Sequence, residues 1–155
     1  MALPISRAQL RVFVKPEEDA AHVRFALVSL AAWPEAVVLE DPITVDDCFV
    51  GDCRRTVRVL RVTLEKGRIR PFVEALNEAL GEDTRALLVK QAETRLDEEG
   101  TFFLRLAKEA LLEGKVRLTD SGDCFHVSMS VLAYPRKREL LLLSVAKIFN
   151  VEKAG

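Results

Sequence analysis

Basic side chains with the spacing of an anion-binding surface are the first chemical feature of this sequence. The richest stretch lies between Cys53 and Pro71 and has a single acidic residue, Glu65. Its basic residues are Arg54, Arg55, Arg58, Arg61, Lys66, Arg68 and Arg70. Guanidinium groups bind phosphate oxygens in pairs, and alternate residues of a strand share a face. Arg54 and Arg58 are therefore predicted to grip successive phosphates from one strand face.

Two further basic groups extend this prediction. Arg136, Lys137 and Arg138 precede an apolar stretch that is predicted to be the last helix. Cations at a helix N-terminus oppose the helix dipole, so these three charges need a role other than helix stability. The other group comprises Arg105, Lys108, Lys115 and Arg117.

A competing interpretation assigns these cations to ion pairs within the protein. The segment Glu35–Asp52 holds six carboxylates and neither Lys nor Arg. Pairing of the basic stretch with this segment would be typical of heat-adapted proteins. The net charge of −1 excludes binding of nucleic acid by bulk positive charge, so only a local patch could provide it. Charge alone leaves both interpretations open.

Cysteine and histidine suggest two other chemistries, neither with a convincing pattern. Cys48, Cys53, Cys124 and His126 could supply a zinc site, but Cys-x-His on a strand is not the usual ligand spacing. Cys124 and His126 also resemble a nucleophile and its base, yet no orienting third residue is recognisable. No phosphate-binding glycine loop is present either. We therefore expect no catalytic residue, no metal and no cofactor.

Length and composition indicate one folded domain over residues 1–155. Hydrophobic residues make up 49% and charged residues 30%, which excludes a disordered chain. The longest apolar run, Leu140–Leu143, is too short to span a bilayer. Three cysteines without a signal-like start favour the cytoplasm. Few amides among many charges indicate a thermophilic source.

Hydrophobic periodicity predicts alternating strands and helices. Strands are expected at Leu10–Val14, Arg54–Glu65, Val116–Thr119 and Cys124–Val131, and helices after Pro16, at Pro71–Gly81 and from Pro135 to about Asn150. A phase change at Val59-Leu60 indicates either a β-bulge or a strand covered on both sides. The acidic stretch before Gly51 is expected to be a loop.

Two segments are ambiguous in this pattern. Thr84–Leu96 suits an edge strand slightly better than a helix. Thr101–Gly114 reads either as one helix or as a strand, Phe102–Leu106, followed by a short helix. The last helix is apolar nearly all round, so either the sheet of its own chain or a partner subunit must bury it, and a homodimer is one expectation. The predicted fold class is α+β, with a single mostly antiparallel sheet and helices packed on one face.

Several short stretches resemble one archaeal family. They are Leu10–Ala20, Arg95–Gly100 with Phe102–Lys108, and Ala133–Glu139. The family is that of small archaeal RNA-binding-domain proteins described as predicted exosome-associated subunits. The turn Gly51–Arg55 departs from the Gly-His-rich turn expected there, because only the glycine remains. The polar ring residues of that turn are absent here, and Arg54 and Arg55 could supply another anion contact.

The resemblance implies a fold similar to the ribosomal protein that binds 5S rRNA, and a role in RNA processing without enzymatic activity. The residues that it implies as RNA-binding are Arg105, Lys108, Tyr134, Arg136, Lys137 and Arg138. With Arg54, Arg55 and Arg58 they form the expected RNA-binding patch. Tyr134 and Trp33 are the only Tyr and Trp, and no strand shows a stacking platform. Structured RNA held through its backbone is therefore expected, and a dimerisation module without an RNA role is the alternative.

Overall fold

The computed structural model describes residues 3–32, 43–50, 55–120 and 122–150. For residues 43–44, 46–50 and 55–57 it describes the path of the backbone alone. Arg54, Cys53, Trp33 and the apolar run at residues 36–39 therefore lie outside the described part of the chain.

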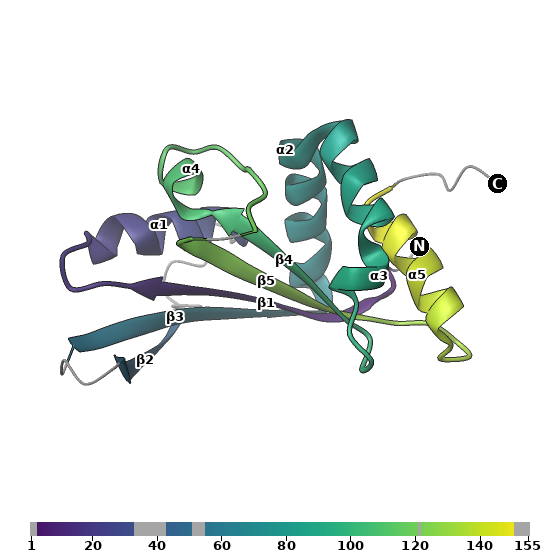
Figure 1. Ribbon diagram of the computed structural model, residues 1–155, viewed down its shortest axis with the longest axis horizontal. Coiled ribbons are helices and arrows are strands. Elements are labelled where there is room, and N and C mark those ends of the chain that lie inside the picture. Colours follow the sequence, from purple (N-terminus) through teal and green to yellow (C-terminus); the bar gives the residue numbers. More distant parts are fainter. Residues whose placement is uncertain (1–2, 33–42, 51–54, 121, 151–155) are drawn as a thin grey trace.

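Five strands form one antiparallel sheet (Figure 1). They are β1 (Ile5–Val14), β2 (Ile43–Val50), β3 (Arg55–Glu65), β4 (Thr101–Ala107) and β5 (Cys124–Val131). The spatial order is β2-β3-β1-β5-β4, so the N-terminal strand lies at the centre and pairs with β3 and β5.

The helices all lie on one face of this sheet (Figure 1). They are α1 (Ala20–Leu30), α2 (Ile69–Lys90), α3 (Ala92–Arg95), α4 (Lys108–Leu112) and α5 (Arg138–Ile148), with a 3₁₀ turn at Lys66–Arg68. The expected α+β architecture, an antiparallel sheet with helices on one face, is confirmed. Within the described residues, no helix combines the length and apolarity needed to cross a membrane.

The hydrophobic core lies between the sheet and the helices. Leu10 and Val12 of β1 and Phe125 of β5 are fully buried there. Phe102 of β4 packs against Phe149, with ring centroids 5.4 Å apart. Leu141, Val145 and Ile148 bury α5 in the same core, and α5 contacts α2, α3 and β5. The apolar surface of the last helix is thus largely covered by its own chain.

The prediction of an edge strand at Thr84–Leu96 is wrong, because this segment is helical. Helix α2 continues to Lys90, and α3 follows almost directly. Leu76 and Leu80 are buried before Gly81, and Leu88 and Ala92 are buried after it, four residues apart in each case, so each helical segment turns one face to the core. Gly81 interrupts α2 with φ 79° and ψ 166°. The glycine marks a change of direction between two helical segments rather than the end of the helix.

Other expectations are settled by strand pairing. The acidic stretch before Gly51 was expected to be a loop, which is wrong, because β2 pairs along β3 from Ile43 to Val50. The pairing of β1 with β3 runs without a bulge, and Val59 and Leu60 are both buried, so β3 is covered on both sides there. Thr101–Gly114 is a strand followed by a helix, as one of the two readings predicted. Val116–Thr119 forms no named strand, only a bridge from Leu118 to β4.

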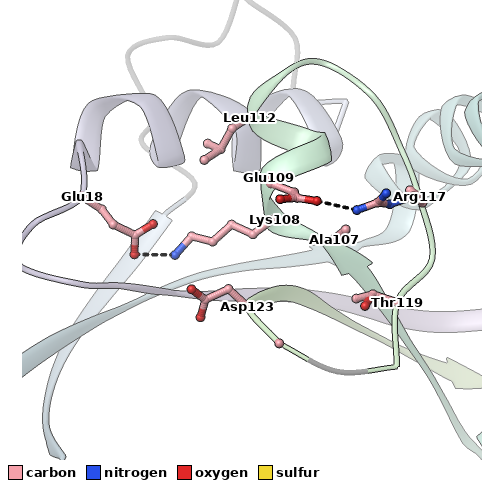
Figure 2. A pocket seen from close by; sticks show the side chains of 9 residues that line it. Glu18, Ala107, Lys108, Glu109, Leu112, Arg117, Thr119 and Asp123 are labelled. Carbon is pink, nitrogen blue, oxygen red and sulfur yellow. Dashed lines mark hydrogen bonds and ion pairs between the residues drawn. The ribbon is translucent and has the colours of Figure 1, made fainter.

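An ion pair of a buried lysine joins the turn before α1 to the junction of β4 and α4. Lys108 is only 4% exposed, and its Nζ donates to Glu18 Oε1 and to the carbonyl oxygen of Phe13, both at 2.6 Å. Figure 2 shows the Lys108 side chain extending toward Glu18. Nearby, Lys15 Nζ donates to Asp123 Oδ2 at 2.6 Å. The two pairs connect the segment that follows β1 to Lys108, directly after β4, and to Asp123, directly before β5.

The ion pair carries a pH dependence. Burial by itself raises the pKa of Glu18, but hydrogen bonds from Lys108 and from the Lys15 amide outweigh it, and the pKa lies below its usual value. A carboxyl group with a lowered pKa in the folded state stabilises the fold above its unfolded pKa of about 4.3. That contribution is lost as the pH falls through the folded value.

Replacement of Lys108 by Met is expected to lower the free energy of unfolding at neutral pH by about 3 kcal/mol, because Glu18 keeps a partly buried charge without its partner. Urea unfolding across a pH series measures this. The difference from wild type should narrow as the pH falls through the lowered pKa of Glu18, because Glu18 is protonated in both proteins below that value. Lys115→Met, at an exposed lysine, is the control. Equal stability of Lys108→Met and wild type at neutral pH would contradict the structural role.

Replacement of Gly81 by Ala is expected to destabilise the protein by about 1–3 kcal/mol, because a side chain is strained at this φ and ψ. The effect comes from the backbone alone, since no atom lies within 4 Å of an added Cβ. Thermal unfolding compares it with Gly67→Ala, where φ is not left-handed and the space is equally open. A Gly81→Ala protein as stable as Gly67→Ala would refute the assignment.

Candidate nucleic-acid interface

The face of the sheet opposite the helices is polar, basic and partly aromatic. Residues of β1 alternate, so Leu10 and Val12 enter the core while Gln9, Arg11 and Phe13 point to the other side. The same alternation in β4 buries Leu104 and exposes its two neighbours. No described helix covers this surface (Figure 1), which we call the open face.

A basic row crosses the open face on four adjacent strands. The pairing registers align Arg61 of β3 with Arg11 of β1, Arg11 with His126 of β5, and His126 with Arg105 of β4. Neighbouring strands are about 4.8 Å apart, so the row spans about 15 Å. Arg7 lies on the same face and pairs with Glu65 at 3.2 Å. Arg61 also interacts within the protein. Arg105 is exposed and donates one long hydrogen bond, from a terminal guanidinium nitrogen to the carbonyl oxygen of Asp120 at 3.4 Å. Arg11 and Arg105 are therefore the members best placed to bind a ligand.

Arg11 is held by an aromatic side chain rather than by a carboxylate. Its guanidinium carbon lies 5.6 Å from the centroid of the Phe13 ring. Phe13 in turn meets the His126 ring edge-on, at 6.1 Å between centroids. Among the described residues, the buried Nε of Arg11 has no hydrogen-bond partner. The packing fixes the group and leaves it with hydrogen-bonding capacity, as an anion-binding arginine requires.

Cys124 and His126 touch but are both neutral at pH 7. Cys124 Sγ lies 3.6 Å from His126 Nε2. Burial raises the pKa of the Cys124 thiol. Burial and then the charges of Arg11 and Arg105 lower the pKa of His126. A thiolate–imidazolium pair needs the opposite shifts, so the contact lacks the ionisation of an activated cysteine nucleophile.

A depression of about 330 Å³ lies on the part of the open face formed by β1, β5 and β4. Its polar and aromatic lining comes from three strands: Gln9, Arg11, Phe103, Arg105, His126 and Ser128. Phe103 is 47% exposed, although its neighbour Phe102 is fully buried. The sequence predicted no aromatic platform on a strand, whereas the structure places two exposed rings, those of Phe13 and Phe103, on this face.

The structure does not bring the predicted patch together. Arg105 lies in the basic row. Arg58 pairs with the buried Val14, and paired residues share a face of the sheet, so Arg58 belongs to the helix-covered face. Lys108 is buried in its pair with Glu18. Arg54 is outside the described residues, and only the backbone of Arg55 is described.

Tyr134, Arg136, Lys137 and Arg138 follow β5, at the end of the sheet away from Lys108. Six residues of β4 separate the two ends, about 20 Å. Tyr134 is 88% exposed, and Arg136 and Lys137 are exposed too. Arg138 instead donates to the carbonyl oxygens of Glu93 and Leu96 and ties α5 to α3. These carbonyl oxygens offset the unfavourable position of the Arg138 charge at the positive end of the helix dipole.

Sequence reasoning missed Arg11 and Phe103 as candidate site residues. Alternation in the first strand did place Arg11 opposite the core, but it could not show which other side chains lie beside it. The reading of residues 101–107 as a strand would have put Phe103 and Arg105 on one face. The clustering with Gln9 and His126 follows from pairing of β1, β5 and β4, which local sequence does not encode.

No metal cluster emerges from the described part of the chain, where no three His, Cys, Asp or Glu side chains converge. Of the four residues considered for zinc, only Cys124 and His126 have described side chains.

Relatives of this chain have been found among named and solved proteins. RNA-binding protein PAB1135 from Pyrococcus abyssi is 30% identical over 141 residues, which cover 88% of each chain. The structure of AF2318 from Archaeglobus fulgidus, a DUF54 protein, is similar with a TM-score of 0.78 and 29% identity, over 93% of this chain and 99% of that one. Mth689, a DUF54 protein from Methanothermobacter thermautotrophicus, has a TM-score of 0.74 and 28% identity, with coverages of 94% and 98%.

These relatives agree with the family that the sequence resembles, and those named here come from archaea. The model of a family described as RNA binding matches residues 7–131. This range contains β3, β4, β5 and all but the first two residues of β1, which are the strands of the open face. The chain therefore belongs to this RNA-binding family.

Proposed function

We propose that this protein is a non-catalytic RNA-binding protein that holds structured RNA by its phosphates against the open face of the sheet. The observation that carries the proposal is the alignment of Arg11, His126 and Arg105 on adjacent strands. As the family resemblance implies, we place this activity in RNA processing, where an accessory subunit would present RNA to a separate enzyme.

Charge is distributed in favour of this face. Among the described side chains of β1, β3, β4 and β5, the open face carries four arginines and one carboxylate, Glu65, which is paired with Arg7. Helix α2 on the opposite side contributes four carboxylates, Glu74, Glu78, Glu82 and Asp83, against the three basic residues Arg70, Arg85 and Lys90. The described side chains of these four strands thus make the open face positive, and attraction of a polyanion would orient it toward this face.

The exposed loop after β5 extends the proposed surface. Tyr134, Arg136 and Lys137 follow Val131, which ends the strand that carries His126. We include these three residues as flanking contacts to the sugar-phosphate backbone. Lys108 and Arg138 are left out, because their charged groups bind within the protein. Arg58 is left out because the register places it on the other face.

The double variant Arg11→Gln/Arg105→Gln is expected to weaken binding to a labelled RNA hairpin by about tenfold for each arginine. Because the variant makes two fewer phosphate contacts, its binding releases fewer counterions, and the magnitude of the slope of log affinity against log salt should fall by about 2. Fluorescence anisotropy over a salt series measures both quantities.

The matched control is Arg70→Gln/Arg117→Gln, which removes the same charge. Arg70 is on α2, and Arg117 pairs with Glu109 of α4. This control should retain nearly wild-type affinity, since neither residue is on the open face. Equal losses in the two double variants would show that net charge, and not the open face, governs binding, and would overturn the proposal.

A further inference from the structure

We infer that the depression on the open face holds one unpaired nucleobase of the bound RNA, stacked on Phe103. This inference rests on the proposed function and adds the kind of RNA: a structured RNA with a bulged or looped-out nucleotide. The base of a fully paired duplex is covered by its neighbours and cannot reach such a ring.

Phe103 has the properties of a stacking surface. It lines the depression and is 47% exposed, an unusual exposure for a phenylalanine. Phe13, the other exposed ring of this face, already contacts Arg11 and His126. Phe103 has no ring or cation contact among the described residues, so its ring remains available to a base.

Hydrogen-bonding groups surround this ring. The registers align Gln9 with Ser128 and Ser128 with Phe103, so an amide and a hydroxyl lie in the same row as the ring. An amide donates and accepts, and a hydroxyl does both, which suits the edge of a base. His126 is neutral at pH 7 and adds another group of either kind.

The arginines lie at the distance that a nucleotide requires. Phe103 and Arg105 are two residues apart on β4, as are Gln9 and Arg11 on β1, which is about 7 Å along each strand. A base stacked on Phe103 would therefore direct its sugar and phosphate toward the basic row. Arg11 itself lines the same depression.

Size favours a single nucleotide over a larger ligand. A volume of about 330 Å³ is at the lower end of the range for small-molecule pockets. A flat duplex surface would contact the arginines but leave the depression empty. The structure thus separates two contributions: phosphate binding by the row, and base stacking in the depression.

The test compares two labelled RNA hairpins that differ only in one bulged nucleotide in the stem. Wild-type protein is expected to bind the bulged hairpin about tenfold more tightly, the usual effect of one stacked base. Phe103→Leu should bind both hairpins with the affinity of wild type for the paired one. Phe25→Leu, at an exposed phenylalanine of α1, is the matched control and should retain the preference.

A second readout follows the base itself. With 2-aminopurine at the bulge, stacking on Phe103 should quench its fluorescence when wild-type protein or Phe25→Leu binds. Phe103→Leu should bind without this quenching. Because Phe103 lies outside the core, its variant should unfold at the same temperature as wild type, which thermal unfolding verifies.

The outcomes distinguish this inference from the proposed function. Equal binding of both hairpins by wild type, with loss of both in Arg11→Gln/Arg105→Gln, would overturn the nucleobase inference and leave phosphate binding intact. A bulge preference that survives Phe103→Leu would also overturn it. Absence of binding to either hairpin at about 50 mM salt would overturn the proposed function as well.

Discussion

The central position of β1 is the constraint on which the rest of the molecule depends. This strand is hydrogen-bonded along both edges, to β3 and to β5, and its side chains alternate between two very different environments. Leu10 and Val12 are fully buried under the helices, whereas Gln9, Arg11 and Phe13 lie on the open face. A slip of one residue in either register would place arginine in the core and leucine in water. Burial of the apolar residues therefore fixes the position of every group on the open face.

Segregation of charge follows from this arrangement. All described helices occupy one side of the sheet, so the other side can present arginine and aromatic groups to a ligand (Figure 1). Phe13 shows how a sheet can hold a cation without neutralising it, because its ring packs against Arg11 and no carboxylate is needed. Lys108 is the reverse case, because its charged group is paired with Glu18 and links the turn before α1 to α4. Two basic residues of similar appearance in the sequence thus have opposite relations to solvent.

Position along the strands separates the other cations as well. Arg138 lies beside two exposed basic residues, yet it binds the carbonyl oxygens of Glu93 and Leu96 and helps to fix α3. Arg136 and Lys137 remain exposed. A basic triplet in sequence is therefore divided between a structural tie and a surface charge. Its division depends on where α3 ends, and this was the region that sequence patterns misassigned.

The sequence by itself determined the fold class, the central strands and the family. Period-two alternation identified Cys124–Val131 as a strand, and short stretches of sequence resembled the RNA-binding family that the comparisons established. Local patterns failed for residues 84–96, because α2 changes direction at Gly81 and continues as a helix beyond it. They also failed to assemble the open face. Arg11, Phe103 and His126 lie on three strands that are far apart in sequence, and only long-range pairing places them in one depression. Tertiary structure decided which charged side chains lie on the surface and which bind within the protein. The reason is that burial and pairing partners depend on contacts that no local segment contains.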